Sequence, residues 1–114
     1  MLKIKIQIYC GDQIAMGPGK ADLLDAIASE GSISAAGRKL GMSYRRCWLL
    51  VDVMNRCWDA PLVATSTEGA TLTGRGVEVL RDYRAVQKLV GSAGAKAGQA
   101  LEQHVRAEPL AAQE

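Results

Sequence analysis

The chain has 114 residues, 48% of them hydrophobic, and a formal net charge of +2. This length suits one domain with a single core, and no apolar run approaches the roughly 20 residues that span a bilayer. The first ten residues alternate polar and apolar types, so they lack the continuous apolar stretch of a signal peptide, and we expect a cytoplasmic location.

Residues 2–9 alternate apolar and polar side chains, which predicts a strand with one buried face. A turn follows at Gly11, and a first helix is expected over about residues 19–29. The apolar stripe of this helix has three- and four-residue spacing and comprises Leu23, Leu24, Ile27 and Ala28.

Residues 34–58 have the pattern of a helix-turn-helix motif. A short helix over residues 35–40 precedes a glycine-containing turn, and a second helix covers residues 44–58. Ser32 and Ser43 are suited to cap the two helices. Small residues around Gly37 let the second helix pack closely across the first. We expect the second helix to enter the major groove of DNA, with its amino-terminal residues at the base edges.

Helical spacing divides the second helix into two faces. The predicted core face holds Tyr44, Cys47, Trp48, Val51, Met54 and Trp58. The outward face holds Arg45, Arg46, Asp52 and Arg56. Leu49 and Val53 also point outward, where they either contact thymine methyl groups or pack under the following hairpin.

The charge distribution supports a surface that faces phosphate. Residues 31–51 contain four cations and no acid, namely Arg38, Lys39, Arg45 and Arg46. The first turn of a helix prefers acids, by ~0.3–1 kcal/mol per charge. Arg45 and Arg46 occupy that turn here, which favours completion of the site by a DNA phosphate or a guanine edge. The alternative is an ordinary solvated face.

Residues 62–66 and 70–73 are short Thr- and Val-rich runs about a glycine-containing turn, which predicts a β-hairpin. Beside a helix-turn-helix, this hairpin over residues 62–73 is interpreted as a wing. Its small hydroxyl donors suit phosphate or minor-groove contacts, and an ordinary exposed turn is the alternative. These donors are Thr65, Ser66, Thr67 and Thr71.

A last helix is predicted to start near Arg75, after a cap at Thr73, and to reach at least Val90. A heptad-like seam along it predicts a homodimer, and comprises Val79, Tyr83, Val86 and Val90. Glycines at positions 91, 94 and 98 each disfavour a helix by about 1 kcal/mol. Residues 91–114 are therefore either a helical extension or a flexible tail.

Catalytic and metal-binding patterns are weak. Cys10, Cys47 and Cys57 form no CxxC pair, and His104 is far from them in sequence, so no zinc site, other metal site or cofactor is expected. Free, buried thiols are the simpler interpretation. Asp22 and Asp25 lack a companion base and are interpreted as solvated charges. We expect the protein not to be an enzyme.

The sequence over residues 17–63, followed by LT-x-x-G-x-x-VL at residues 72–80, closely resembles the N-terminal DNA-binding domain of ModE-type molybdate-dependent transcriptional regulators. That domain is related to the winged helix of LysR-type regulators. The resemblance covers roughly residues 2–90 and is most specific over residues 41–46 and 48–52.

The resemblance implies a homodimer that reads a palindromic operator in double-stranded DNA near molybdenum-related genes. The implied fold is mainly α with a small β component: a winged helix-turn-helix over residues 1–90 with a long C-terminal dimerisation helix. The candidate DNA-binding residues are Ser34, Arg38, Lys39, Ser43, Tyr44, Arg45, Arg46, Leu49, Thr65, Ser66, Thr67 and Thr71.

Full-length members of that family carry Mop-type oxyanion-binding modules after this domain. The residues that follow Val90 here are too few for such a module, so we expect DNA binding not to respond directly to molybdate. Any response would come from a separate effector-sensing partner. The rival interpretation is a winged-helix interaction or dimerisation module that does not bind DNA. Arg45 and Arg46 discriminate between the two, because such a module has no need for them.

Overall fold

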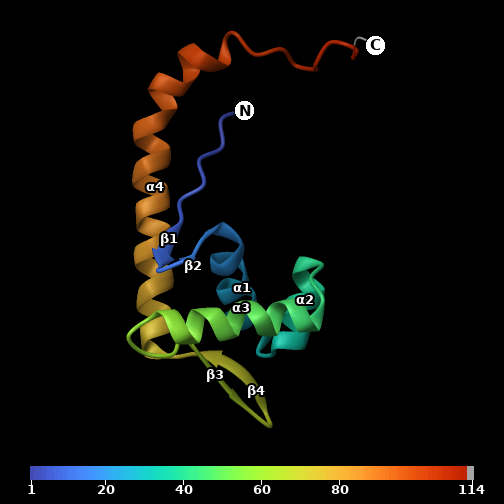
Figure 1. The fold of residues 1–114 in the computed structure, drawn as a ribbon, viewed down its shortest axis with the longest axis vertical. Coiled ribbons are helices and arrows are strands. Elements are labelled where there is room, and N and C mark those ends of the chain that lie inside the picture. Colours follow the sequence, from blue (N-terminus) through green and yellow to red (C-terminus); the bar gives the residue numbers. More distant parts are fainter. Residues whose placement is uncertain (113–114) are drawn as a thin grey trace.

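The computed structural model describes residues 1–112 and confirms the predicted winged helix-turn-helix (Figure 1). Its elements in chain order are β1 (Ile8–Cys10), β2 (Gln13–Met16), α1 (Pro18–Glu30), α2 (Ile33–Leu40), α3 (Tyr44–Cys57), β3 (Val63–Ser66), β4 (Gly69–Leu72) and α4 (Gly74–Glu102). The strands form two antiparallel hairpins, β1–β2 and β3–β4. Within residues 1–112, no helix is long and apolar enough to cross a membrane.

The amino-terminal segment differs from the prediction of one strand over residues 2–9. Only β1 is a strand, and it pairs with β2, which the sequence analysis did not predict, about a turn at Gly11. The residues before β1 run along α4 instead (Figure 1). There the Leu2 amide donates to Glu102 Oε1 at 3.0 Å, and the Tyr83 hydroxyl donates to the Ile6 carbonyl at 2.7 Å. The alternating apolar side chains therefore pack against a helix and not against a sheet.

The three predicted serine and threonine caps are present. The Ser32 hydroxyl accepts from the Ala35 amide, and the Ser43 hydroxyl accepts from the Arg46 amide, at 3.0 and 3.1 Å. Thr73 caps α4 in the same way. Gly31 and Gly41 end α1 and α2 in the left-handed conformation, which glycine adopts without steric cost. These local signals set the helix boundaries.

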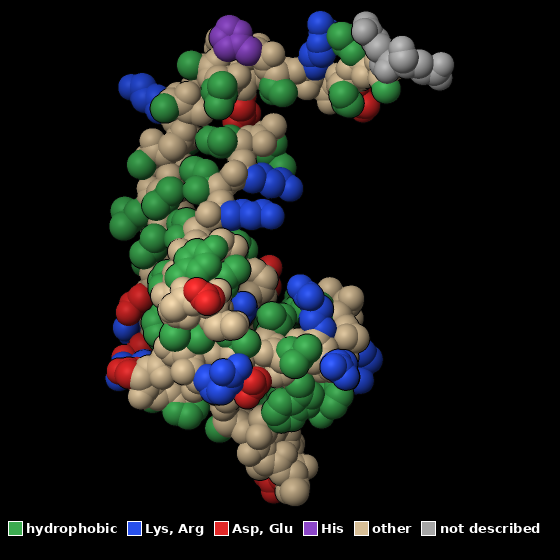
Figure 2. Space-filling view, viewed as in Figure 1, with side chains coloured by type: hydrophobic (Ala, Val, Ile, Leu, Met, Phe, Trp, Pro, Cys, Tyr) green, Lys and Arg blue, Asp and Glu red, His purple; other side chains and the backbone are tan. Residues whose placement is uncertain are grey.

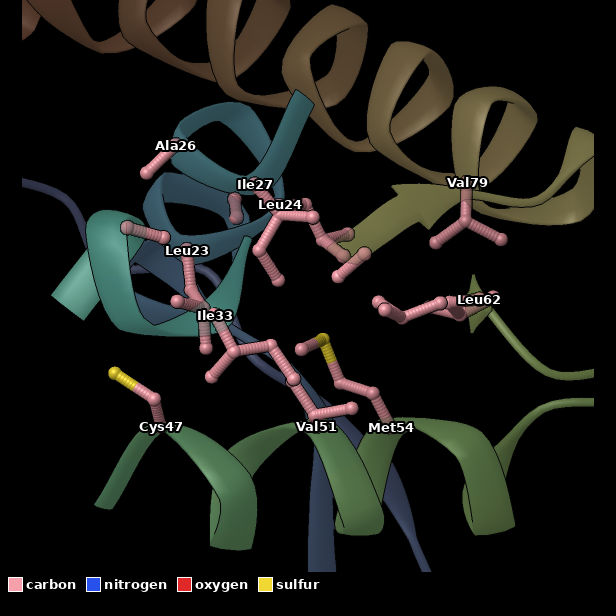
Figure 3. Packing of buried hydrophobic residues seen from close by; sticks show 14 of the residues in the cluster. Leu23, Leu24, Ala26, Ile27, Ile33, Cys47, Val51, Met54, Leu62 and Val79 are labelled. Atoms are coloured by element: carbon pink, nitrogen blue, oxygen red, sulfur yellow. The ribbon is translucent and has the colours of Figure 1, made fainter. Parts of the chain in front are cut away.

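The core lies between α1, α3, the base of the wing and the start of α4 (Figure 3). Leu23, Leu24 and Ile27 of α1 are fully buried, as predicted. Ala28, which was assigned to the same stripe, is exposed, whereas Ala21 and Ala26 are buried. The buried face of α1 is therefore broader than predicted, with Ala21 and Ala26 at its two edges.

On α3 the predicted core face is only partly correct. Cys47, Val51 and Met54 are buried, but Tyr44 and Trp48 are exposed. At ~100° per residue, Trp48 lies about one quarter-turn from Cys47, at the border of the buried stripe. Its ring contacts Tyr44 instead of the core, with centroids 6.1 Å apart and an edge-on angle of 83°.

The cysteines do not form the uniformly buried set that was expected. Cys47 is buried, Cys57 is half-buried and Cys10 is exposed. Cys10 ends β1 directly before the turn at Gly11, which leaves its side chain at the surface. The three thiols are free, and the described residues contain no cluster of ligands that could hold a metal ion.

Helix α4 continues to Glu102, which decides between the two alternatives for the segment after Val90. Gly94 and Gly98 lie against the amino-terminal segment, where an added Cβ would come within 2.9 Å of Ile4 and 2.5 Å of Leu2. These glycines thus provide room for the segment that crosses the helix. Residues 106–112 form no helix or strand, and residues 113–114 of the predicted tail lie outside the described residues.

Two of the four predicted dimerisation residues belong to the core of the same chain. Val79 and Tyr83 are buried, while Val86 and Val90 are exposed at 44% and 36%. Only the latter pair is available to a partner. The ionic contact of Arg84 with Asp22 and Asp25 also joins α4 to α1, so these two aspartates are ion-paired and not simply solvated.

Candidate DNA interface

The helix-turn-helix is held by a close approach of α2 and α3 at Gly37. A Cβ at this position would lie 2.9 Å from the Met42 carbonyl oxygen and 3.0 Å from Cys47 Sγ. The Met42 amide also donates to the Gly37 carbonyl at 2.9 Å. Packing at this glycine, expected from the small residues in the sequence, fixes the direction in which α3 leaves the turn.

The wing is tied to α3 by Asn55, a residue that sequence reasoning missed. Its Oδ1 accepts from the Leu62 and Val63 amides at 2.9 and 3.0 Å, and its Nδ2 donates to the Val63 carbonyl at 3.1 Å. The wing also contacts α1, because the Ala70 amide donates to the Gly31 carbonyl at 2.9 Å. Asparagine has a low helix propensity, so its presence inside a predicted helix is the one sequence signal that pointed to a special role for Asn55.

A cleft of about 130 Å³ separates the wing from the amino-terminal ends of α2 and α3. Four of the predicted DNA-binding residues line it together with Trp48, and they are Ser34, Tyr44, Thr65 and Ser66. The hydroxyls of α2 and of the wing therefore face one hollow, although they are about 30 residues apart in sequence. Thr67 and Thr71 are exposed on the wing outside this cleft.

The predicted cations lie on the exposed surface of α2 and α3. Lys39 contacts Ser29 and Glu30 of α1, at 3.1 and 3.7 Å. Among the residues that the structure describes, Arg38, Arg45 and Arg46 have no acidic partner. In Figure 2 the Lys and Arg side chains gather on the side of the molecule where α2 and α3 meet, beside a hydrophobic patch.

The first turn of α3 contains two cations and no acid. The helix dipole places additional positive potential at this end, so Arg45 and Arg46 lie in a field that favours a bound anion. Lys20 of α1, which the sequence did not assign to the DNA interface, extends this field. Burial lowers the pKa of the Lys20 ammonium, and the nearby Arg46 guanidinium lowers the pKa further. Ser43 uses its hydroxyl oxygen as the cap of α3.

Leu49 is the remaining predicted contact residue, and it is 56% exposed. It is not packed under the wing, the second alternative that the spacing allowed. It lies one turn after Arg45 on the outward side of α3. The surface thus combines exposed guanidinium groups, hydroxyl donors around a cleft and apolar side chains.

The sequence of the chain is similar to those of known bacterial regulators. The profile of the bacterial regulatory helix-turn-helix proteins of the lysR family matches residues 20–77. The molybdenum-pterin-binding protein MopB of Rhodobacter capsulatus is 39% identical over 77 residues, which cover 63% of this chain and 28% of MopB. The molybdenum transport protein ModE of Azotobacter vinelandii is 33% identical over 78 residues, which cover 64% of this chain and 29% of that ModE. The chain spans less than a third of these relatives.

Solved structures show the same fold. The DNA-binding domain of CbnR in a DNA complex superposes with a TM-score of 0.62 at 24% identity, over 73% of this chain and 95% of that domain. Full-length CbnR, a LysR family transcriptional regulator, gives a TM-score of 0.57 at 24% identity, over 69% of this chain and 27% of CbnR.

Proposed function

The chain belongs to the lysR family of bacterial regulatory helix-turn-helix proteins, and from this premise we propose that it binds double-stranded DNA sequence-specifically and regulates transcription. The observation that carries this proposal is the pair Arg45 and Arg46, which are exposed on the first turn of α3 and have no acidic partner within residues 1–112. A major groove admits a helix, and arginine reads guanine through its O6 and N7 acceptors. The structurally similar CbnR domain was solved in complex with DNA, which supports the same role here.

The wing and the cleft beside it supply the contacts that position the protein. Hydroxyl groups of Ser34, Thr65 and Ser66 are suited to phosphate oxygens, which fix the register of a protein on the duplex without reading sequence. The free amides at the start of α2 add donors at the same place. In this proposal α3 reads bases while α2 and the wing hold the two flanking backbones.

Selection from a randomised duplex library tests this function. We expect the chain to enrich one sequence motif, because arginine contacts to base edges discriminate by about 1–3 kcal/mol per base pair. A pool that stays random after repeated rounds would contradict sequence-specific binding. The recovered duplex then serves for titrations, and a scrambled duplex of the same composition is its control.

We extend the proposal to the genes that are regulated, because the relatives are named for molybdenum binding and molybdenum transport. Their names support control of molybdenum-related genes. Sensing of an oxyanion is not part of the role that we propose for residues 1–112. It is assigned instead to a separate effector-sensing partner.

We further propose that two copies of the chain associate through α4. Val86 and Val90 are exposed, and an apolar groove of about 240 Å³ that Ile6, Ile8 and Trp58 help to line lies directly beside Val86. Figure 2 shows hydrophobic side chains continuing along the length of α4. A two-fold dimer built on this helix would present two copies of α3 and so match a palindromic operator.

The double substitution Val86→Glu with Val90→Glu should convert the dimer to a monomer at micromolar concentrations in sedimentation equilibrium. Charged side chains cannot be buried in an apolar seam without a large desolvation cost. Both valines are exposed in the single chain, so the monomer should keep its helical content. Ala85→Glu, on an exposed neighbour outside the predicted seam, is the control and should leave the dimer intact. A wild-type chain that sediments only as a monomer would contradict this proposal.

A further inference from the structure

Three large apolar side chains lie exposed on the first two turns of α3. Tyr44, Trp48 and Leu49 are 55%, 38% and 56% exposed, and we call them the α3 apolar patch. A single exposed leucine needs no explanation, but a contiguous apolar cluster on a surface generally marks a contact site. Figure 2 shows hydrophobic side chains over the end of α3 that lies nearer α2, above the wing.

Two of the three side chains in the α3 apolar patch contact each other. The Tyr44 and Trp48 rings meet edge to face, 6.1 Å apart, and both line the cleft between the wing and the ends of α2 and α3. Leu49 follows Trp48 directly and lies one helical turn after Arg45, so the two outward side chains share a face. Leu49 and Arg45 therefore face the same side of α3.

The positive charge of Arg45 and Arg46 beside the patch indicates which kind of molecule binds there. An isologous contact with a second copy would bring Arg45 and Arg46 of both chains together, and like charges at close range oppose it. A polyanion satisfies the cations and the apolar side chains at once only if it also offers an apolar group. In the major groove that group is the C5-methyl of thymine.

We propose that Leu49, supported by Trp48, contacts a thymine C5-methyl in each half-site and thereby determines sequence preference at that base pair. This inference rests on the DNA-binding function proposed above and adds the base class that the patch reads. Arg45, one turn earlier on α3, would then read a neighbouring base pair.

Replacement of single thymines by deoxyuridine removes only the methyl group and tests the contact directly. The probe is the duplex recovered by library selection, with one thymine exchanged at a time, in anisotropy titrations. We expect the wild-type chain to bind about fourfold more weakly when the contacted thymine is exchanged, as follows from burial of one methyl group. Thymines elsewhere in the duplex should tolerate the exchange.

Leu49→Ala completes the test as a double-mutant cycle. This variant should bind the thymine duplex about tenfold more weakly and should no longer distinguish thymine from deoxyuridine at the sensitive position. The exposed Leu110→Ala in the carboxy-terminal segment is the matched control and should keep the wild-type discrimination. Thermal unfolding of both variants should match the wild type, because neither leucine is in the core.

The outcomes separate this inference from the proposed function. Tight binding to the selected duplex that is indifferent to every thymine exchange would overturn the thymine contact and leave DNA binding in place. A Leu49→Ala variant that still discriminates the methyl would overturn the role of Leu49. Loss of self-association in Leu49→Ala, with unchanged affinity for DNA, would assign the patch to a second copy instead. Failure to select any duplex would overturn both proposals together.

Discussion

Substitution of both Arg45 and Arg46 by alanine should weaken binding to the selected duplex by a factor of about 100 or more. Each arginine that reads a base contributes ~1–3 kcal/mol, and each lost phosphate contact should lower the salt slope by about 1. Anisotropy titrations at several salt concentrations measure both quantities. Stability should not fall, because both side chains are exposed and two cations leave a turn in which the helix dipole disfavours them.

The control for this variant removes the same amount of charge elsewhere. Arg81 lies on α4 and Arg106 in the segment after it, and both are exposed. Their double replacement by alanine should change affinity by less than a factor of about 3, which is the loss expected from weak long-range attraction. If the two double variants lose affinity equally, the first turn of α3 has no special role in recognition.

The largest expected effect on stability concerns Gly76 in the first turn of α4. A Cβ at this position would lie 2.1 Å from the Leu62 carbonyl oxygen, which also accepts a hydrogen bond from the Thr73 amide at 2.9 Å. Leu62 is fully buried, so its backbone cannot move away without disturbing the core. Gly76→Ala should therefore lower the free energy of unfolding by about 3 kcal/mol.

Gly74→Ala is the matched control, two residues earlier in the same turn. No atom lies within 4 Å of an added Cβ there, and the backbone is helical. Alanine exceeds glycine in helix propensity by up to about 1 kcal/mol, so this variant should unfold at the wild-type temperature or above it. Chemical denaturation of both variants measures the difference. Equal stability of the two would show that α4 and Leu62 do not approach as closely as described.

The sequence predicts the helices well, because their ends depend on local chemistry. Ser43 and Thr73 are caps that any helix of this sequence would use, and Gly41 ends α2 where a left-handed residue is needed. β2 has no comparable local signal. Its four residues, Gln13–Met16, are too short a run to show the alternation of a strand. The strand is defined only by its pairing with β1.

Tertiary contacts explain the remaining errors. Glycines 94 and 98 disfavour a helix locally, yet they accommodate Ile4 and Leu2 from the other end of the chain, which no local pattern reveals. Trp48 has the spacing of a core residue, but it lies at the border of the buried stripe. Val79 and Tyr83 fit a dimer seam by period, whereas the fold buries them against its own core.

Some residues of the candidate DNA interface could be predicted from local sequence, and others depend on tertiary contacts. The exposed cations of α3 follow from helical period and from the absence of acids in its first turn, both of which are local. The cleft that unites Ser34 with Thr65 depends on how the wing is held, and that depends on Asn55 bridging to Leu62 and Val63. An asparagine inside a helix is only a weak signal, and the segment that it binds cannot be identified from a single sequence.

The most direct test of the central claim is the salt dependence of binding by the whole chain to the selected duplex. Arg38, Arg45 and Arg46 form no ion pair with any described residue, and together with the same cations of a second protomer they should release counterions on binding. We expect the logarithm of the association constant to fall linearly with the logarithm of salt concentration, with a slope of about −0.9 for each phosphate that the cations of the dimer neutralise. Binding that is absent at low salt, or that does not change with salt, would contradict it.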